Sequence, residues 1–178
     1  MCGRCQSHPP AFDGTVSAWP YRFPVDEVIQ AFKYGERLGL AEFLVDALSA
    51  RIACASEGNR VDLVLPMPLH PVRLSQRGFN QAAEIARPLA RRLKLPLALQ
   101  ALHRVRDTPT QAGLSLKARR LNIRRAFLCS QDLSGLTVAV VDDVMTTGAT
   151  LSEAAAELKR AGATRVFNWV VARTPPPD

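Results

Sequence analysis

Val138-Ala-Val-Val-Asp-Asp-Val-Met-Thr-Thr-Gly-Ala-Thr150 passes from an apolar run through two acids into a turn rich in threonine and glycine. Residues 136–141 are apolar and mostly β-branched, which predicts a buried strand. Residues 150–160 have the apolar spacing of an amphipathic helix, and residues 166–171 form a second apolar run. This order predicts a βαβ unit, in which the two strands are parallel.

The chain before this unit also alternates helical patterns with apolar runs. We expect strand pairing over residues 15–23, helices over 25–35 and 40–52, a strand over 61–66, a polar loop over 67–78, a helix over 82–95 and strand-like chain over 97–102. The 178 residues therefore predict one α/β domain, with a central, mostly parallel sheet flanked by helices. We place it at residues 15–173, after an appendage over 1–14 and before a disordered tail over 174–178.

The net charge of +7 favours anionic partners, either small phosphorylated molecules or a nucleic acid. No run approaches the ~18 apolar residues of a membrane helix, and Met-Cys-Gly-Arg-Cys at the N-terminus lacks the apolar core of a signal peptide. We therefore expect a soluble, cytoplasmic protein without a membrane span. The sequence leaves open whether it forms a homodimer.

The two acids and the turn after them predict a site for phosphate and ribose. Backbone N–H groups at a helix N-terminus are free donors at the positive end of the helix dipole, and Gly148 lets the backbone approach a ligand closely. Asp142 and Asp143, at the carboxyl end of the predicted strand, can accept hydrogen bonds from ribose hydroxyls or hold Mg²⁺, directly or through water. Alternatively, the acids cap the turn and the threonines form an ordinary helix start. The complete string favours the ligand site.

The string resembles the signature of type I phosphoribosyltransferases, which bind 5-phosphoribosyl-1-pyrophosphate (PRPP). Other segments resemble, more narrowly, the ComF family of ComFC- and GntX-like proteins. These segments are Cys2-Gly-Arg-Cys5, Lys33-Tyr34-Gly35, Pro66-Met-Pro-Leu-His70, Arg77-Gly-Phe-Asn-Gln81, residues 108–111 and residues 122–127. The resemblance covers almost the whole chain. It implies the type I phosphoribosyltransferase fold, with a flexible flap and a short, truncated N-terminus like a zinc ribbon.

The resemblance also implies a role for each group of residues. By this resemblance, Asp142 and Asp143 are catalytic and bind Mg²⁺. The 5-phosphate of PRPP would be bound by Thr146, Thr147, Gly148, Ala149 and Thr150. The pyrophosphate would be bound by Pro66, Met67, Pro68, Leu69 and Arg77. A flap would bind anions through Gln111, Lys117, Arg119, Arg120 and Arg124, and would exclude water from the reaction.

Some of these residues have purely structural alternatives. Arg77 either pairs with phosphate or is a surface arginine, and Asn80 and Gln81 either orient the loop before them or cap the following helix. The basic segment, residues 117–125, is predicted to be helical and either binds anions or forms a solvated face. We favour anion binding because no acidic residue accompanies these cations.

Cys2 and Cys5 have the spacing of half a zinc ribbon, in which thiolates two residues apart bind one ion. A complete site needs four ligands. We therefore expect Zn²⁺ only if a second cysteine pair upstream completes the site.

The leading hypothesis is a PRPP-binding, Mg²⁺-dependent protein of the ComF type, linked by its resemblance to DNA uptake in natural competence. It would transfer the phosphoribosyl group and release pyrophosphate. One alternative is a non-catalytic adaptor for single-stranded DNA or a competence helicase, and another is a conventional pyrimidine or adenine salvage enzyme. In the 6-oxopurine enzymes an aspartate stands where this chain has Thr146, which disfavours hypoxanthine or guanine as the acceptor.

Overall fold

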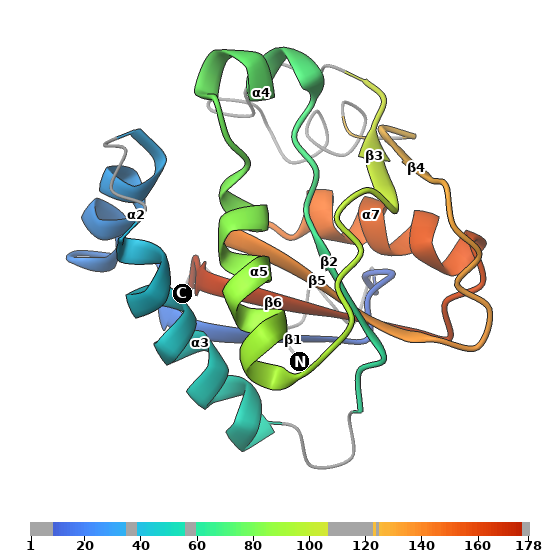
Figure 1. Ribbon diagram of the computed structural model, residues 1–178, viewed down its shortest axis with the longest axis horizontal. Helices are drawn as coiled ribbons and strands as arrows, with labels where there is room; N and C mark the ends of the chain where they lie inside the picture. The colour runs from blue at the N-terminus through green and yellow to red at the C-terminus, as the bar shows by residue number, and fades with distance from the viewer. Residues whose placement is uncertain (1–8, 35–38, 56–59, 107–122, 124, 176–178) are drawn as a thin grey trace.

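The computed structural model describes residues 9–34, 39–55, 60–106, 123 and 125–175 (Figure 1). Its elements are β1 (Gly14–Pro20), α2 (Val25–Tyr34), α3 (Leu40–Ala55), β2 (Leu63–Pro66), α4 (Pro71–Arg77), α5 (Gln81–Leu93), β3 (Leu102–Arg104), β4 (Phe127–Cys129), β5 (Thr137–Met145), α7 (Ala149–Arg160) and β6 (Arg165–Arg173). Helices thus alternate with strands, as the sequence predicted.

The main sheet has the strand order β1-β6-β5-β2, and every neighbouring pair in it is parallel. At its centre, Val140 of β5 is in register with Leu65 of β2 on one side and Asn168 of β6 on the other. Strands β3 and β4 form a separate, antiparallel pair. The predicted α/β fold is confirmed, including the unit of strand, helix and strand formed by β5, α7 and β6.

Helices cover both faces of the main sheet (Figure 1). Because side chains alternate along a strand, Ala139 and Val141 pack into one core with α3 and α5, whereas Val138 and Val140 pack into a second core with α7. Residues 138–141 of β5 are apolar on both faces for this reason, as is usual for a central parallel strand.

The two central strands lead to helices on opposite faces. The chain leaving β2 passes through α4 to α5, while the chain leaving β5 enters α7 on the other face. Open parallel sheets bind ligands at such a point, beyond the carboxyl ends of the strands. Strand β2 ends at Pro66, opposite Val141, but β5 continues alongside β6 as far as Met145. The last part of β5 therefore extends past β2 at the mouth of this crevice.

Three local predictions were wrong. The strand predicted over residues 136–141 extends to Met145 because β6 continues to pair with it, so the two acids lie within the strand and not after it. The predicted loop over 67–78 contains the short helix α4, which His70 caps at its N-terminus and Gly78 ends in the left-handed conformation. In the region 97–102, Leu97 forms only an isolated bridge with Val64, and β3 begins at Leu102.

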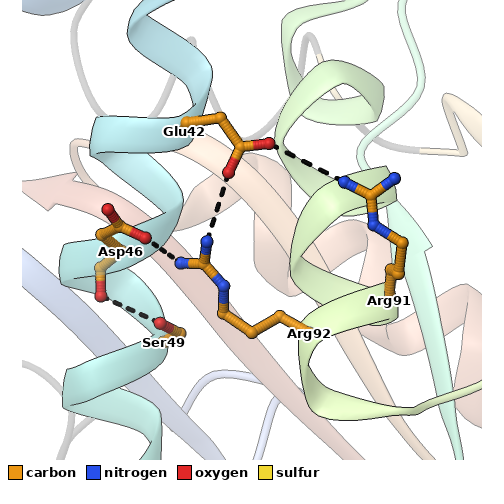
Figure 2. Close-up of polar contacts among 5 residues, drawn as sticks. All are labelled: Glu42, Asp46, Ser49, Arg91 and Arg92. Atoms are coloured by element: carbon orange, nitrogen blue, oxygen red, sulfur yellow. Dashed lines mark hydrogen bonds and ion pairs between the residues drawn. The ribbon is translucent and has the colours of Figure 1, made fainter.

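Helices α3 and α5 are joined by charged side chains as well as by their apolar faces (Figure 2). Arg92 of α5 donates to Asp46 and, over 3.2 Å, to Glu42 of α3. Arg91 lies 3.8 Å from the other carboxylate oxygen of Glu42. The helix that begins at the crevice is thereby held against α3.

Residues 11–14, which we assigned to the appendage, pack against the domain. The Ala11 N–H donates to Ser152 Oγ over 3.0 Å, and the Asp13 carboxylate accepts the Val166 N–H and pairs with Lys159. At the other end, the Thr174 N–H donates to the Met145 carbonyl over 2.9 Å. Within the described ranges, no helix is both long enough and apolar enough to cross a membrane.

Candidate functional site

A cavity of about 380 Å³ lies at the crevice between β5 and β2. Its lining includes Asp142, Asp143, Thr146, Thr147, Gly148, Ala149, Thr150, Met67, Pro68, Leu69 and Arg77. All of these were predicted as site residues from the sequence. Pro66 is not part of the lining; it is the last residue of β2. The structure therefore brings the two predicted groups together, one from each central strand, although their roles stay predictions.

The turn between β5 and α7 is shaped for a close approach of backbone to ligand. Gly148, the N-cap residue of α7, has a φ of 75° and makes no side-chain capping hydrogen bond. This conformation favours glycine, and a Cβ atom here would lie 2.6 Å from Met145 Cε, so the end of the flexible Met145 side chain would have to move. The Ala149 N–H donates to Thr147 Oγ1 over a long 3.4 Å, and the start of α7 belongs to the lining of the cavity, where the helix dipole suits an anion.

The two acids meet a lysine that the predictions did not include. Lys33 Nζ of α2 lies 2.8 Å from Asp143 Oδ2, and the two side chains are only 19% and 13% exposed. Asp142 Oδ1 accepts the Asp143 N–H, and Asp143 Oδ1 accepts the Val144 N–H. The carboxylates are therefore held by the backbone and by one buried cation.

This arrangement shifts the charge states of two of these groups. Burial, together with the neighbouring Asp143 charge, raises the pKa of Asp142 to about 8, although the Asp143 N–H and Lys33 oppose the shift. Burial by itself would lower the pKa of Lys33, but the attraction and hydrogen bond of Asp143 outweigh it and leave that pKa above its ordinary value. At neutral pH the Asp142 carboxyl group thus carries less negative charge than a free aspartate, because its pKa is raised.

The donor set fits Mg²⁺ only if a ligand completes the coordination. Carboxylate oxygens are suitable ligands for this cation, yet within the described ranges no group of three or more His, Cys, Asp or Glu side chains could hold a metal. Mg²⁺ is commonly held by one or two carboxylates together with substrate phosphates and water. Asp142 and Asp143 would hold it in that way, jointly with a phosphorylated ligand.

The segment Arg77-Gly-Phe-Asn-Gln81 connects α4 to α5, and both structural roles expected for this segment are filled by Asn80. Asn80 Oδ1 caps α5 by accepting the Ala82 N–H, while Asn80 Nδ2 donates to the Met67 carbonyl over 3.1 Å. Arg77 Nη1 donates to Gln81 Oε1 over 2.8 Å. The segment therefore ties the start of α5 to the loop that follows β2.

Several residues of the cavity were missed from the sequence, among them Tyr21, Lys33, Arg73 and Arg104. Lys33 belongs to one of the segments that carried the family resemblance, so a signal for it existed. Arg104 lies on β3, outside the main sheet, and nothing in its neighbourhood in the sequence indicates that it reaches this crevice.

Other predicted site residues lie outside the described residues, namely Cys2, Cys5, Gln111, Lys117, Arg119, Arg120 and Arg124. The basic helix predicted to run through Arg125 does not include that residue, because its φ of 53° is left-handed. The Arg125 N–H donates to Glu153 Oε1 over 2.6 Å, so an acid of α7 does lie beside the end of the basic segment.

Comparison with known proteins shows the family of the chain. The phosphoribosyl transferase domain family matches residues 80–175. The chain is 35% identical over 176 residues to the DNA utilization protein YhgH of Salmonella typhi, and 34% identical over 178 residues to Competence protein F of Haemophilus influenzae. Each match covers 97% of this chain and 78% of the relative. An adenine phosphoribosyltransferase structure from Saccharomyces cerevisiae aligns with a TM-score of 0.49 and 16% identity, over 76% of this chain and 69% of that one.

The class of protein defined by the fold and by the family match is thus the phosphoribosyl transferase domain. Within this class, the relatives narrow the assignment further. The chain belongs to the ComF family of type I phosphoribosyltransferases.

Proposed function

We propose that this protein binds PRPP together with Mg²⁺ in the cavity between β5 and β2. The observation that carries the proposal is the meeting, in one cavity, of two adjacent acids and the start of α7 with four cationic side chains. These are Lys33, Arg73, Arg77 and Arg104. PRPP has a matching order of groups, with a phosphate at one end, ribose hydroxyls in the middle and a pyrophosphate at the other end.

Each part of the cavity has one role in this proposal. The turn from Thr146 to Thr150 binds the 5-phosphate through backbone N–H groups and hydroxyls, and Asp142 and Asp143 accept hydrogen bonds from the ribose. The loop after β2 and Arg77 bind the pyrophosphate. The cavity volume of about 380 Å³ lies within the usual range of small-molecule sites.

The corresponding reaction is phosphoribosyl transfer. The bond between ribose C1 and the pyrophosphate oxygen breaks, a nucleophile of the acceptor bonds to C1, and pyrophosphate leaves. Bound Mg²⁺ would neutralise charge on the departing pyrophosphate. The cationic side chains lining the cavity would stabilise the same charge.

We further propose that this activity, or PRPP binding by itself, serves the uptake or use of DNA. Support comes from the relatives, which are called a DNA utilization protein and a competence protein, and from the net charge of +7. The alternative is a conventional salvage enzyme, whose phosphorylated substrate would suit the same charge. A panel of bases, assayed for pyrophosphate release with and without single-stranded DNA, would separate the two functions.

Isothermal titration with PRPP tests the central claim. We expect wild-type protein to bind PRPP with Mg²⁺ and to bind it more weakly without Mg²⁺. The double variant Asp142→Asn/Asp143→Asn keeps the size of both side chains but removes their charge, and should lose at least ten-fold in affinity, since a hydrogen bond to a charged group contributes about 1.5–3 kcal/mol.

The matched control is Asp132→Asn, which removes the charge of an exposed aspartate outside the cavity. It should bind PRPP like the wild type. Unchanged PRPP affinity in the folded double variant would overturn the assignment of the site.

A further inference from the structure

Gln81, the first residue of α5, is a polar side chain in an unusual position. It is only 2% exposed, yet it belongs to the lining of the cavity. Its Oε1 accepts the hydrogen bond from Arg77 Nη1, but its Nε2 is buried and has no hydrogen-bond partner among the described residues. Buried polar groups nearly always have a partner, so a donor left open at a cavity points to a ligand.

The orientation of this amide follows from its neighbour. A guanidinium group has donors and no acceptor, so only the oxygen of Gln81 can face Arg77. Nitrogen must then occupy the other position. The unpartnered group of this cavity-lining residue is therefore an N–H donor, which suits an anionic oxygen.

The neighbouring Asn80 differs in this respect. Its Oδ1 accepts the Ala82 N–H and its Nδ2 donates to the Met67 carbonyl, so both ends of its amide serve the protein. Gln81 uses one end for the protein and leaves the other open. The two adjacent amides thus differ: both ends of Asn80 bind the protein, whereas Gln81, which belongs to the lining of the cavity, has a buried Nε2 without a partner among the described residues.

The position of Gln81 indicates which part of a ligand it meets. It begins a helix, where the dipole favours negative charge, and it is bonded to Arg77. Asn80 ties the same helix start to the loop after β2. The turn proposed for the 5-phosphate belongs instead to the start of α7. Gln81 therefore lies with the pyrophosphate group of residues.

We propose that Gln81 is a specificity-determining residue for the pyrophosphate group of PRPP. Its Nε2 donates to a pyrophosphate oxygen while its Oε1 holds the Arg77 guanidinium in place for the same group. This inference rests on the proposed function. It predicts that Gln81 contributes to the binding of PRPP but not to the binding of ribose 5-phosphate, which has the 5-phosphate and the ribose but no pyrophosphate.

The test measures the affinities of three ligands by titration in the presence of Mg²⁺: PRPP, inorganic pyrophosphate and ribose 5-phosphate. Gln81→Met keeps the size of the side chain but removes both polar ends. We expect it to weaken PRPP and pyrophosphate binding about ten- to a hundred-fold and to change ribose 5-phosphate binding less than about two-fold.

A second variant, Gln81→Glu, can still accept from Arg77 but replaces the open donor with negative charge. It should bind pyrophosphate more weakly than Gln81→Met does. It also carries the test if Gln81→Met does not fold, as judged by circular dichroism and melting. Gln100→Met, at an exposed glutamine outside the cavity, is the matched control and should leave all three affinities unchanged.

Two results would overturn the inference. Unchanged PRPP and pyrophosphate affinities in folded Gln81 variants would mean that Nε2 meets only water, and an equal loss for ribose 5-phosphate would mean that Gln81 has a structural role. Wild-type protein that binds no PRPP would instead overturn the proposed function, so the two failures are distinguishable.

Discussion

At the scale of single residues, the surroundings of Asp142 favour the protonated form of its carboxyl group. Asp142 lies beside Asp143 and Lys33, and burial with the Asp143 charge raises its pKa to about 8. In the unfolded chain the pKa of an aspartate is about 4. Between these two pH values the folded chain binds a proton that the unfolded chain has lost, so the free energy of unfolding falls as the pH rises from about 4 to about 8.

Asp142→Asn should remove this pH dependence, because asparagine does not ionise. The quantity to compare is the melting temperature of the variant minus that of the wild type, both without ligand. We expect this difference to be larger at pH 8 than at pH 5. Thermal melting at both pH values measures the difference. A difference that does not change with pH would show that Asp142 is already ionised in the folded protein.

Gly148 supports a second prediction at this scale. Alanine there would occupy a left-handed conformation and place its Cβ 2.6 Å from Met145 Cε. The conformation alone costs about 1–2 kcal/mol, and moving the end of the flexible Met145 side chain adds a smaller cost. We therefore expect Gly148→Ala to lower the free energy of unfolding by slightly more than the conformational cost, and to weaken PRPP binding, as denaturant titration and calorimetry would measure.

Gly135→Ala provides the control for that experiment. Gly135 has a φ of 79°, but an added Cβ would meet nothing within 4 Å. This variant should show the conformational cost alone and normal PRPP binding. Equal losses of stability in the two variants would contradict the crowding at Met145.

At the scale of elements, the contact between α3 and α5 combines an apolar core with an exposed network of charges (Figure 2). Arg92 is 39% exposed, while its partners Glu42 and Asp46 are 57% and 65% exposed. Such pairs contribute little, because water and salt screen them. The apolar residues of the two helices must therefore supply most of the stability of this contact.

Arg92→Met should consequently lower the free energy of unfolding by no more than about 1 kcal/mol, with a smaller loss in high salt. Arg91→Met is the control, since Arg91 is 80% exposed and 3.8 Å from its single partner Glu42, and should have almost no effect. Denaturant unfolding at low and high salt measures both. A loss for Arg92→Met well above this limit would show that the charged network, and not the apolar contact, holds α5 in place.

At the scale of the whole molecule, the net charge of +7 should attract polyanions, and the segment 117–125 holds a concentration of cations. We expect the triple variant Arg119→Glu/Arg120→Glu/Arg124→Glu to weaken binding of single-stranded DNA at low salt. In the wild type, affinity should fall steeply with salt, by a logarithmic slope of about 0.7 for each phosphate contact. The slope should be smaller in the variant.

The control triple Arg51→Glu/Arg87→Glu/Arg91→Glu makes the same change of net charge at exposed positions elsewhere. Fluorescence anisotropy with a labelled oligonucleotide compares the two sets of exchanges. Equal losses in both triples would mean that DNA responds to the total charge, and unchanged affinity in the first triple would mean that the segment is only a solvated face.

The sequence by itself determined the parts of this protein that depend on neighbours along the chain. The apolar run, the acids and the turn before Gly148 predicted a strand, a helix start and an anion site, because strand alternation, helix periodicity and the N-terminal dipole are local properties. The same patterns predicted the helices and strands that became α2, α3, β2, α5, α7 and β6. Their ends were less accurate, since pairing with β6 carried β5 on to Met145.

Only the tertiary structure decided which distant residues share the cavity. Lys33 meets Asp143 because α2 packs near the end of β5, and Arg104 arrives from a separate pair of strands. Gln81 was recognised as part of a motif, but its open amide end became visible only once its burial and its bond to Arg77 were known. The physical reason is that local periodicity specifies which elements form, whereas burial, charge state and the partner of each polar group depend on packing between elements far apart in the chain.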